Sequence, residues 1–204
     1  MIKNIIFDFG DVFINLDKEA TFAELYKLGV DEISLEMMQI AQQYEMGNLT
    51  SAEFISEFTS KFPNVKEEDF IDAWNAILKD FPSHKFDFLK SLADSKKYQL
   101  FLLSNTNDLH ISWVQKEWGI DIFTEFKNCF VQFYLSHEMK MRKPNDNIYQ
   151  FVLSENNLNP SETIFIDDTD ENTLAAQKLG IKVWNIDPKK EDVTTLLTRK
   201  EFSE

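Results

Sequence analysis

The chain lacks the features that mark disulfide-rich, fibrous or membrane-spanning proteins. Its 204 residues include a single cysteine, Cys129, which excludes an internal disulfide and fits a reducing cytoplasm. No apolar run approaches the roughly 18 residues needed to cross a bilayer, and the first run meets Asp8 too soon for a signal peptide. With 43 % apolar and 27 % charged residues, the composition excludes disorder and collagen and predicts a cytoplasmic globular protein.

Basic residues are scarce relative to acidic ones. The chain has 21 Lys and Arg residues against 35 Asp and Glu residues, which gives a formal net charge of −14. Such a surface repels nucleic acid and anionic membranes, so we expect neither as a partner. No motif indicates a protein partner. A small anionic ligand is compatible with this charge where a metal ion or local donors cancel it.

The chain alternates between strand-like and helical patterns. Alternation of this kind predicts an α/β fold with a mainly parallel, doubly wound, Rossmann-like sheet. Ligands of such sheets bind beyond the carboxyl ends of the strands. The predicted strands are residues 2–7, 100–103, 130–135, 163–166 and 181–186, and the predicted helices of this part are 86–93, 108–118, 145–155, 173–179 and 189–199.

The stretch from about residue 17 to 80 has helical periodicity and no convincing strand. Within it, Thr50 followed by Glu53 is typical of a capping box at the start of a helix. We therefore expect an all-helical insertion after the first strand. The predicted division assigns residues 1–15 and 82–204 to the α/β core and residues 16–81 to the insertion.

Carboxylates follow two of the predicted strands. Asp8 ends the first strand, and Asp167 and Asp168 end the fourth. In a parallel sheet these side chains can converge, and converging carboxylates need a cation between them. Ligands that are all oxygen favour Mg²⁺. The alternative for each cluster is a local one, in which Asp11 is a turn residue and Asp167 to Asp170 cap the next helix.

Two further segments carry donors suited to an anion. Ser104, Asn105 and Thr106 follow the second strand, and their hydroxyl, amide and backbone N–H groups can cradle an oxyanion. The alternative is an ordinary helix N-cap. Lys143, within Arg142-Lys143-Pro144, can neutralise phosphate as a compact cation. The alternative there is a solvated basic loop before a helix.

Taken in order, these segments resemble the four signature motifs of the haloacid dehalogenase-like (HAD) hydrolase superfamily. The first and last are similar in residue type and position to motifs that follow strands in that family. Other pieces resemble a branch that contains bacterial sugar phosphatases acting on glucose 1-phosphate. The superfamily motifs are Asp8-Phe9-Gly10-Asp11-Val12, Leu103-Ser104-Asn105, Arg142-Lys143-Pro144, and Phe165-Ile166-Asp167-Asp168 with Asn172. The branch pieces are Leu103-Ser104-Asn105-Thr106-Asn107 with Leu109-His110, and Met141-Arg142-Lys143-Pro144 with Ile148-Tyr149-Gln150.

The resemblance implies a catalytic role for four of these positions. Asp8 would attack phosphorus and form an aspartyl-phosphate. Ser104 and the backbone around Asn105 would bind the phosphoryl oxygens. Lys143 would neutralise charge on the phosphoryl group and on Asp8. The expected activity is hydrolysis of a small phosphorylated metabolite, with a sugar 1-phosphate as one option.

The resemblance also implies a Mg²⁺ site and a cap. Asp8, Asp168 and the backbone carbonyl of Gly10 would bind the metal directly, and Asp167 would contribute through a bound water. Asn172 would orient these ligands. The helical insertion would be the cap, and its turn at Glu45-Met46-Gly47-Asn48 would either face the active site or simply connect two helices.

One position departs from the family pattern. Most phosphatases of the superfamily have a second aspartate two residues after the nucleophile, and here that position is Gly10. The missing acid–base group is typically worth about 10²–10⁴-fold in rate. Asp11 is adjacent, but an extended backbone would point its side chain the other way.

Three explanations of Gly10 follow. The substrate has a good leaving group, the cap or substrate supplies the proton, or the protein is a weak member that binds metal and phosphate without efficient turnover. Hydrolytic dehalogenation, which would need no metal, is a further alternative. The pair Asp167-Asp168 favours phosphate chemistry over it.

Overall fold

The computed structural model describes residues 1–202, and its centre is a parallel sheet of five strands. The strand order is β3-β2-β1-β4-β5, and every neighbouring pair is parallel. This is the predicted doubly wound α/β fold. The strands are β1 (Asn4–Phe7), β2 (Gln99–Ser104), β3 (Gln132–Leu135), β4 (Thr163–Asp167) and β5 (Lys182–Asn185).

The strand order places β1 at the centre, where the chain reverses its direction of travel across the sheet. β2 and β3 lie on one side of β1, and β4 and β5 on the other. Asp8 follows β1 directly, and its backbone N–H donates to the carbonyl of Ile166 in β4 at 2.8 Å. A crevice forms at such a point beyond the carboxyl ends of the strands, because the flanking connections diverge there.

Alternate residues of the three central strands point to opposite faces of the sheet. Phe7 and Ile166 belong to the apolar core on one face, and Ile6 and Phe165 to the core on the other. Because both faces are covered, the interior positions of these strands are apolar on both sides, and their polar residues stand at the strand ends. The sheet is therefore rigidly held, and the strand ends are well-defined positions for side chains.

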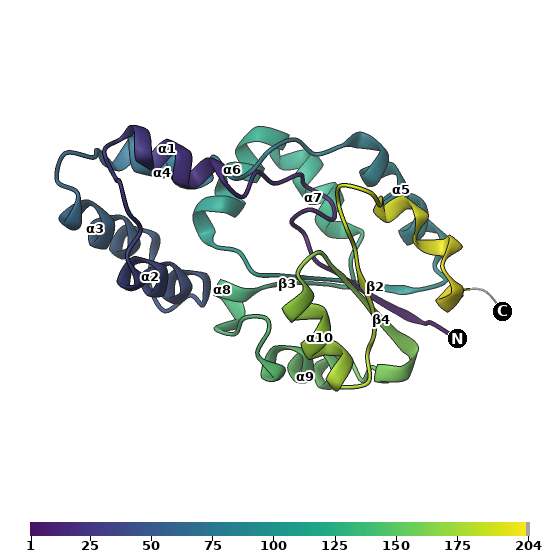
Figure 1. Cartoon of the computed structure of the whole chain (residues 1–204). Helices are drawn as coiled ribbons and strands as arrows, with labels where there is room; N and C mark the ends of the chain where they lie inside the picture. The colour runs from purple at the N-terminus through teal and green to yellow at the C-terminus, as the bar shows by residue number, and fades with distance from the viewer. Residues whose placement is uncertain (203–204) are drawn as a thin grey trace.

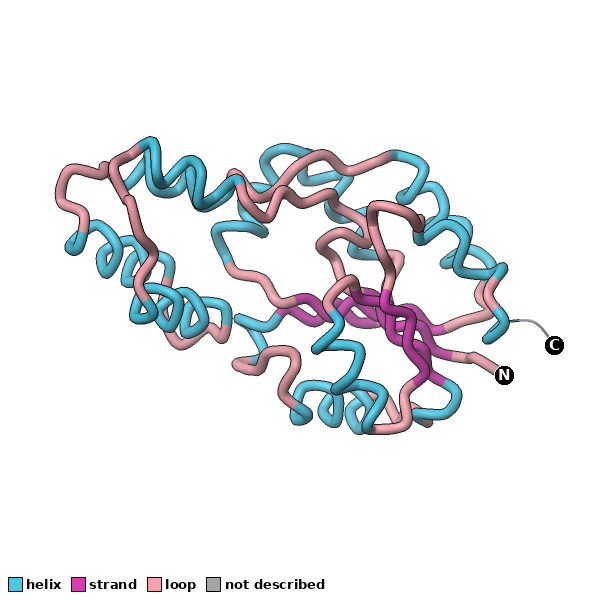
Figure 2. Tube along the Cα trace, viewed as in Figure 1, coloured by secondary structure: helices cyan, strands magenta, loops and turns pink. Residues whose placement is uncertain are grey.

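Helices cover the sheet on both faces, as Figures 1 and 2 show. Phe126 and Leu89 pack on one face, and Val152 and Ala176 on the other. The first face carries α5 (Ser83–Ser95), α6 (Asp108–Trp118) and α7 (Ile120–Asn128), the second carries α9 (Asp146–Glu155) and α10 (Asp170–Lys178), and α8 (Ser136–Met139) follows β3. A short 3₁₀ helix, η1 (Pro160–Glu162), precedes β4.

A helical cap is inserted after β1. It has its own apolar core, in which Phe58 stacks on Phe70 at 3.9 Å and Tyr44 stacks on Phe54 at 4.3 Å between ring centroids. The predicted capping box is present at the start of its third helix. The cap consists of α1 (Ala20–Lys27), α2 (Leu35–Glu45), α3 (Ser51–Lys61) and α4 (Glu67–Asn75), at the left of Figure 1.

The two chain segments that connect the cap to the core lie side by side. Leu16 on the way in forms an antiparallel bridge with Leu78 on the way out. The backbone N–H of Asp17 donates to the carbonyl of Ile77 at 2.8 Å. The cap is therefore joined to the core by a paired, hydrogen-bonded stem.

The predicted helix at residues 189–199 is wrong. This segment forms two 3₁₀ helices, η2 (Val193–Thr198) and η3 (Lys200–Phe202). Asp192 accepts from the N–H and hydroxyl of Thr194 at 2.9 and 2.7 Å, and the hydroxyl of Thr195 donates to the carbonyl of Asp192 at 2.8 Å. Such local side-chain bonds compete with the regular α-helical pattern. The predicted strands at 2–7 and 130–135 each start two residues later than expected.

Candidate active site

Three carboxylates converge at the carboxyl ends of β1 and β4. One carboxylate oxygen from each of Asp8, Asp167 and Asp168 lies within 4.8 Å of the other two. Asp167 is fully buried and Asp8 is 9 % exposed. Convergence arises because the two strands are hydrogen-bonded neighbours in register, although the residues are far apart in sequence.

A buried lysine joins two of these carboxylates. The Lys143 Nζ lies 2.8 Å from Asp8 Oδ1 and 2.6 Å from Asp167 Oδ2. Its side chain is completely shielded from solvent, so the alternative of a solvated basic loop is wrong for this residue. An unpaired charge at such a depth would be very costly, and the two carboxylates provide the compensation.

Both carboxylate oxygens of Asp167 accept hydrogen bonds from other groups of the protein. Its Oδ1 accepts from the backbone N–H of Thr169 at 2.8 Å, and the Asn172 Nδ2 donates to Oδ1 and Oδ2 at 3.1 and 3.0 Å. Tyr149 in turn donates to the carbonyl of Asn172 at 2.9 Å. A carboxylate held by so many donors is well placed to orient Lys143, and it fits the expected indirect contribution to a metal better than direct binding.

The Asn105 side chain holds Lys143 in place instead of pointing at a ligand. Its Nδ2 donates to the Lys143 carbonyl at 2.9 Å, and its Oδ1 accepts from the Lys143 N–H at 2.9 Å. Only the backbone of Asn105 can therefore serve the oxyanion role. The hydroxyl of Ser104 is buried and has a long contact, 3.5 Å, to the carbonyl of Asn105, which leaves it suited to a stronger acceptor.

The N-cap alternative for residues 104–106 is wrong. The N-cap of α6 is Asn107, whose Oδ1 accepts from the backbone N–H of His110 at 3.1 Å. The backbone N–H of Thr106 donates to the Ser136 hydroxyl at 3.0 Å. The loop after β2 is thus fixed directly after Ser104 and Asn105, and the backbone N–H of Thr106 is already bonded within the protein.

Gly10 stands where an added side chain would meet the cap stem. A Cβ built on Gly10 would lie 2.6 Å from Leu16 Cδ1. Asp11 is not extended, contrary to expectation, because its φ is 55°. Its Oδ1 accepts from the Leu16 N–H at 3.0 Å, and its Oδ2 pairs with Lys18 at 3.2 Å. Leu16 therefore occupies space that an acid–base aspartate would need, and both carboxylate oxygens of Asp11 serve other partners.

Lys18 is a residue of the site that sequence reasoning missed. Its ammonium group makes a short hydrogen bond to Asp168 Oδ2 and also pairs with Asp11. Its signal in the sequence is weak, because a lysine in a polar segment before a helix is typical of a solvated surface. Only the partner 150 positions away, Asp168, reveals its place.

The cap turn after α2 contacts the core beside the site. Arg142, next to Lys143, pairs with Glu45 at 3.2 Å, and the hydroxyl of Ser136 donates to the Glu45 carbonyl at 2.7 Å. A Cβ on Gly47 would lie 1.9 Å from the carbonyl oxygen of His137. The turn is therefore docked on the core and is more than a connection between two helices.

Burial dominates the electrostatics of Asp8. Desolvation raises the pKa of its carboxyl to about 7. The positive charge of Lys143 opposes this rise, and repulsion from Asp167 adds to it. A divalent cation would oppose this shift, because it favours the ionised carboxylate. The donor set fits a hard cation such as Mg²⁺, because it consists of clustered carboxylates and contains no sulfur or imidazole ligand.

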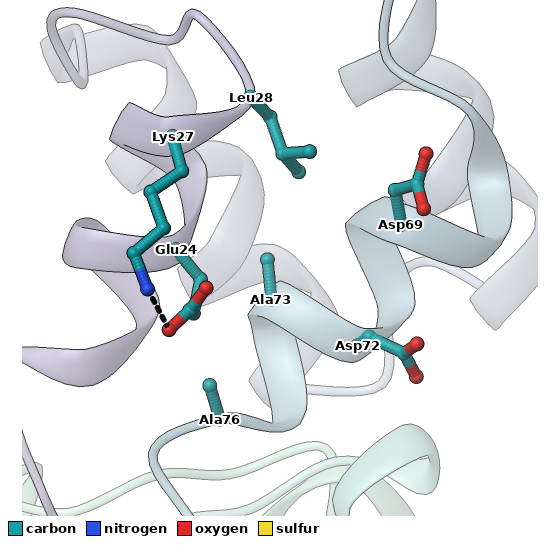
Figure 3. A pocket seen from close by; sticks show the side chains of 7 residues that line it. All are labelled: Glu24, Lys27, Leu28, Asp69, Asp72, Ala73 and Ala76. Atoms are coloured by element: carbon teal, nitrogen blue, oxygen red, sulfur yellow. Dashed lines mark hydrogen bonds and ion pairs between the residues drawn. The ribbon is translucent and has the colours of Figure 1, made fainter.

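Two hollows among the described residues differ in their relation to the site. Figure 3 shows one of about 300 Å³ between α1 and α4, which is lined by the paired Glu24 and Lys27, 2.7 Å apart, and by Asp69 and Asp72. It contains no residue of the predicted motifs. A polar cavity of about 1040 Å³ adjoins Asp168 and the cap stem, and Lys18 lines it.

Comparison with known proteins identifies the family. The model of the haloacid dehalogenase-like hydrolases matches residues 5–186, which span most of the chain and include the four motif segments. The chain belongs to the haloacid dehalogenase-like hydrolase family. It is thus a HAD-type hydrolase, as the motifs predicted.

Solved structures of HAD proteins share the architecture. A HAD-family enzyme of Bacteroides thetaiotaomicron, BT-2542, solved as a magnesium complex, is 36 % identical with a TM-score of 0.86, covering 97 % of this chain and 99 % of that one. The same enzyme was also solved with magnesium and inorganic phosphate. A HAD-like hydrolase of Porphyromonas gingivalis is 30 % identical with a TM-score of 0.85, over 98 % and 100 % of the two chains.

A characterised relative has a named activity. D-ribitol-5-phosphate phosphatase of Bacteroides thetaiotaomicron is 28 % identical over 190 residues, covering 90 % of this chain and 91 % of the relative. In the part of the chain that the structure describes, no helix combines the length and apolar character required to traverse a bilayer.

Proposed function

We propose that this HAD hydrolase is a Mg²⁺-dependent phosphomonoesterase that acts on a small phosphorylated sugar or sugar alcohol. The observation that carries the proposal is the buried Lys143 between Asp8 and Asp167, at 2.8 and 2.6 Å, beside Asp168. Such a cluster binds a dianion only when fixed positive charge offsets the carboxylates. The D-ribitol-5-phosphate phosphatase relative supports the substrate class.

Asp8 is the proposed nucleophile. A carboxylate oxygen of Asp8 attacks phosphorus, the bond from phosphorus to the leaving oxygen breaks, and an aspartyl-phosphate forms as the leaving alkoxide takes a proton from water or from the substrate. Water then attacks phosphorus, which releases phosphate and restores Asp8. Lys143 neutralises the growing negative charge, while Ser104 Oγ and the backbone N–H groups near Asn105 hold phosphoryl oxygens.

Asp8, Asp168 and the Gly10 carbonyl would hold Mg²⁺ directly, and Asp167 through a water. Bound there, the ion would supply charge neutralisation and alignment of the phosphoryl group. Mg²⁺ complexes of BT-2542 support this assignment. The dense hydrogen bonding of Asp167 supports its indirect role.

Residues 16–81 are proposed as the cap that closes the site, with residues 1–15 and 82–204 as the catalytic core. The paired stem at Leu16 and Leu78 supports these limits. The docked turn at Glu45 lies beside Arg142, so the cap in this position limits access of water to the site. Exclusion of water protects the aspartyl-phosphate until it must be hydrolysed.

Gly10 bears on the choice of substrate. A sugar 1-phosphate releases an anomeric oxygen, which leaves more readily than an ordinary alcohol, whereas ribitol 5-phosphate is an ester of an ordinary primary alcohol. The relative with the latter activity makes a sugar-alcohol phosphate a second substrate class to test beside the anomeric one.

The test is steady-state phosphate release from a panel of esters, with Mg²⁺ and with a chelator. The panel contains p-nitrophenyl phosphate, glucose 1-phosphate, glucose 6-phosphate, D-ribitol 5-phosphate and a nucleoside monophosphate. We expect chelator-sensitive turnover that favours the sugar or sugar-alcohol esters. Halide release from haloacids without metal would replace the proposal with a dehalogenase, and folded protein that binds Mg²⁺ and phosphate but turns over no ester would replace it with a binding protein.

A further inference from the structure

Lys18 brings a second positive charge to the candidate metal site. Its ammonium group touches Asp168, which ends β4, and lies 3.2 Å from Asp11 Oδ2. Its side chain is 57 % exposed, unlike the fully shielded Lys143. The two neighbouring carboxylates favour the charged ammonium, which lysine carries at neutral pH in any case.

The backbone that carries Lys18 is fixed on both sides. Leu16 is bonded to Asp11 and bridged to Leu78, and the N–H of Ala20 donates to the carbonyl of Asp17 at 3.0 Å. Lys18 therefore approaches Asp168 from a defined point of the cap stem. The contact is a built feature of this stem, and a freely moving surface lysine would not be directed to one carboxylate.

Negative charge exceeds positive charge around the candidate metal site. When ionised, Asp8, Asp167 and Asp168 contribute three negative charges and neighbouring Asp11 a fourth, and Lys143 offsets one of them. Lys18 offsets a second, and it does so on Asp168, the carboxylate proposed to bind the metal directly. Each added positive charge weakens binding of a cation and strengthens binding of an anion, because the two effects share one electrostatic field.

We propose that Lys18 balances the two ligands of the site: it lowers the affinity for free Mg²⁺ and raises the affinity for the phosphoryl dianion. This inference rests on the metal and phosphate site of the proposed function and assigns a role to a residue outside its motifs. Lys18 thereby favours occupation of the site by metal and phosphate together over metal alone. It is a positioning and charge-balancing residue and has no part in bond breaking.

Isothermal titration calorimetry at low ionic strength tests this with Lys18→Met. We expect the Mg²⁺ dissociation constant to fall roughly tenfold, the size that Coulomb's law gives for a unit charge about 5 Å from a divalent ion in a water-like medium. Inorganic phosphate, titrated into Mg²⁺-saturated protein, should bind several-fold more weakly. Both changes should shrink at high salt.

Lys18→Arg and Lys79→Met are the matched controls. Arginine keeps the charge and should retain both affinities near those of the wild type. Lys79 lies on the same stem and lines the same cavity as Lys18, but it pairs with Asp17 at 3.8 Å and with neither Asp11 nor Asp168. Its loss should change both affinities less than twofold, and circular dichroism should show all variants folded.

The proposal requires that Lys18→Met bind Mg²⁺ more tightly and phosphate more weakly than the wild type. Equal Mg²⁺ affinity in wild type and Lys18→Met, or weaker binding of both ligands, would overturn the role of Lys18 while leaving the metal site of the proposed function intact. Failure of the wild type and the variant to bind any Mg²⁺ would overturn the proposed metal site together with this inference.

Discussion

Gly10 and Leu16 together account for the absence of an acid–base side chain near Asp8. Because Leu16 Cδ1 stands 2.6 Å from the position of a Cβ on Gly10, an aspartate there must displace the leucine. The displaced atoms are the end of a flexible side chain, so the change is feasible but strained. The sequence shows only the glycine, and the structure shows what fills its place.

The clash between Leu16 and a side chain at position 10 predicts that substitutions at these two positions have non-additive effects on activity. Gly10→Asp alone should change the hydrolysis of an ordinary alkyl phosphate only a few-fold, whereas Gly10→Asp combined with Leu16→Ala should raise kcat by about 10–100-fold, within the usual range of general acid–base catalysis. A double-mutant cycle on D-ribitol 5-phosphate measures the coupling. A strictly additive cycle in folded proteins would show that Leu16 does not restrain the new side chain.

His110 gives the fold a pH dependence of predictable sign. Its ring stacks on Trp74 at 5.4 Å, and its Nδ1 and Nε2 face Asn107 and the Trp74 carbonyl. Burial lowers its pKa to about 4, and nearby His137 acts in the same direction. The unfolded chain therefore takes up a proton near pH 6.5, before the folded chain does, so stability falls as pH drops between about 6.5 and 4.

His110→Gln should weaken this dependence. Between pH 7 and pH 4, the unfolding free energy of the wild type should fall by about 1–3 kcal/mol more than that of the variant. Urea denaturation at several pH values measures the difference. Identical pH profiles would show that His110 titrates normally in the folded protein.

Lys143 and Lys18 show how far single residues could be predicted. Lys143 lies in a motif whose order along the chain pointed to Asp8 and Asp167, and the structure brings the three together. Lys18 has no motif, and its contact with Asp168 depends on the path of the cap stem. Lys143 was predictable because it belongs to a motif of the family, although it lies in the loop between α8 and α9, whereas Lys18 has no motif and is placed by loop geometry alone.

At the level of elements, the buried strands were predictable because their apolar runs are uninterrupted. Helix α7 was not, because Ile120 and Ile122 are exposed while Phe123 and Phe126 are buried. Apolar residues on several sides of a helix hide its period. The four-residue α8 is too short to give a periodic signal.

The docking of the cap turn on α8 gives a prediction about glycine. Gly47 and Gly29 both have positive φ, 66° and 86°, but only a Cβ on Gly47 would strike backbone, the carbonyl of His137 at 1.9 Å. Gly29→Ala should therefore cost about 1 kcal/mol of stability, from its backbone conformation alone. Gly47→Ala should cost more and should also lower kcat/KM, because the turn must leave its place on the core.

Chemical denaturation and steady-state kinetics of the two alanine variants check this prediction. The loss of unfolding free energy in Gly47→Ala should exceed that in Gly29→Ala by at least about 1 kcal/mol, because the backbone must move to relieve the clash. Equal losses of stability, with equal kcat/KM, would show that contact between the cap turn and α8 has no part in activity.

The whole molecule combines a rigid sheet edge with a cap on a paired stem. The net charge of −14 gives the surface no attraction for anions, so recognition of a phosphate ester depends on the buried Lys143, on Lys18 and on the metal proposed at Asp8 and Asp168. These charges act at the carboxyl ends of β1 and β4, where the chain reverses the direction in which it adds strands to the sheet. The catalytic proposal therefore depends on one carboxylate, Asp8.

The rate of phosphate release by Asp8→Asn, with Mg²⁺ and the best ester of the panel, tests that proposal most directly. The amide cannot attack phosphorus, so we expect kcat to fall by at least about 10³-fold, as for other enzymes that lose their nucleophile. Circular dichroism and thermal unfolding should show a folded variant. Turnover within tenfold of the wild type, in the folded protein, would contradict nucleophilic attack by Asp8.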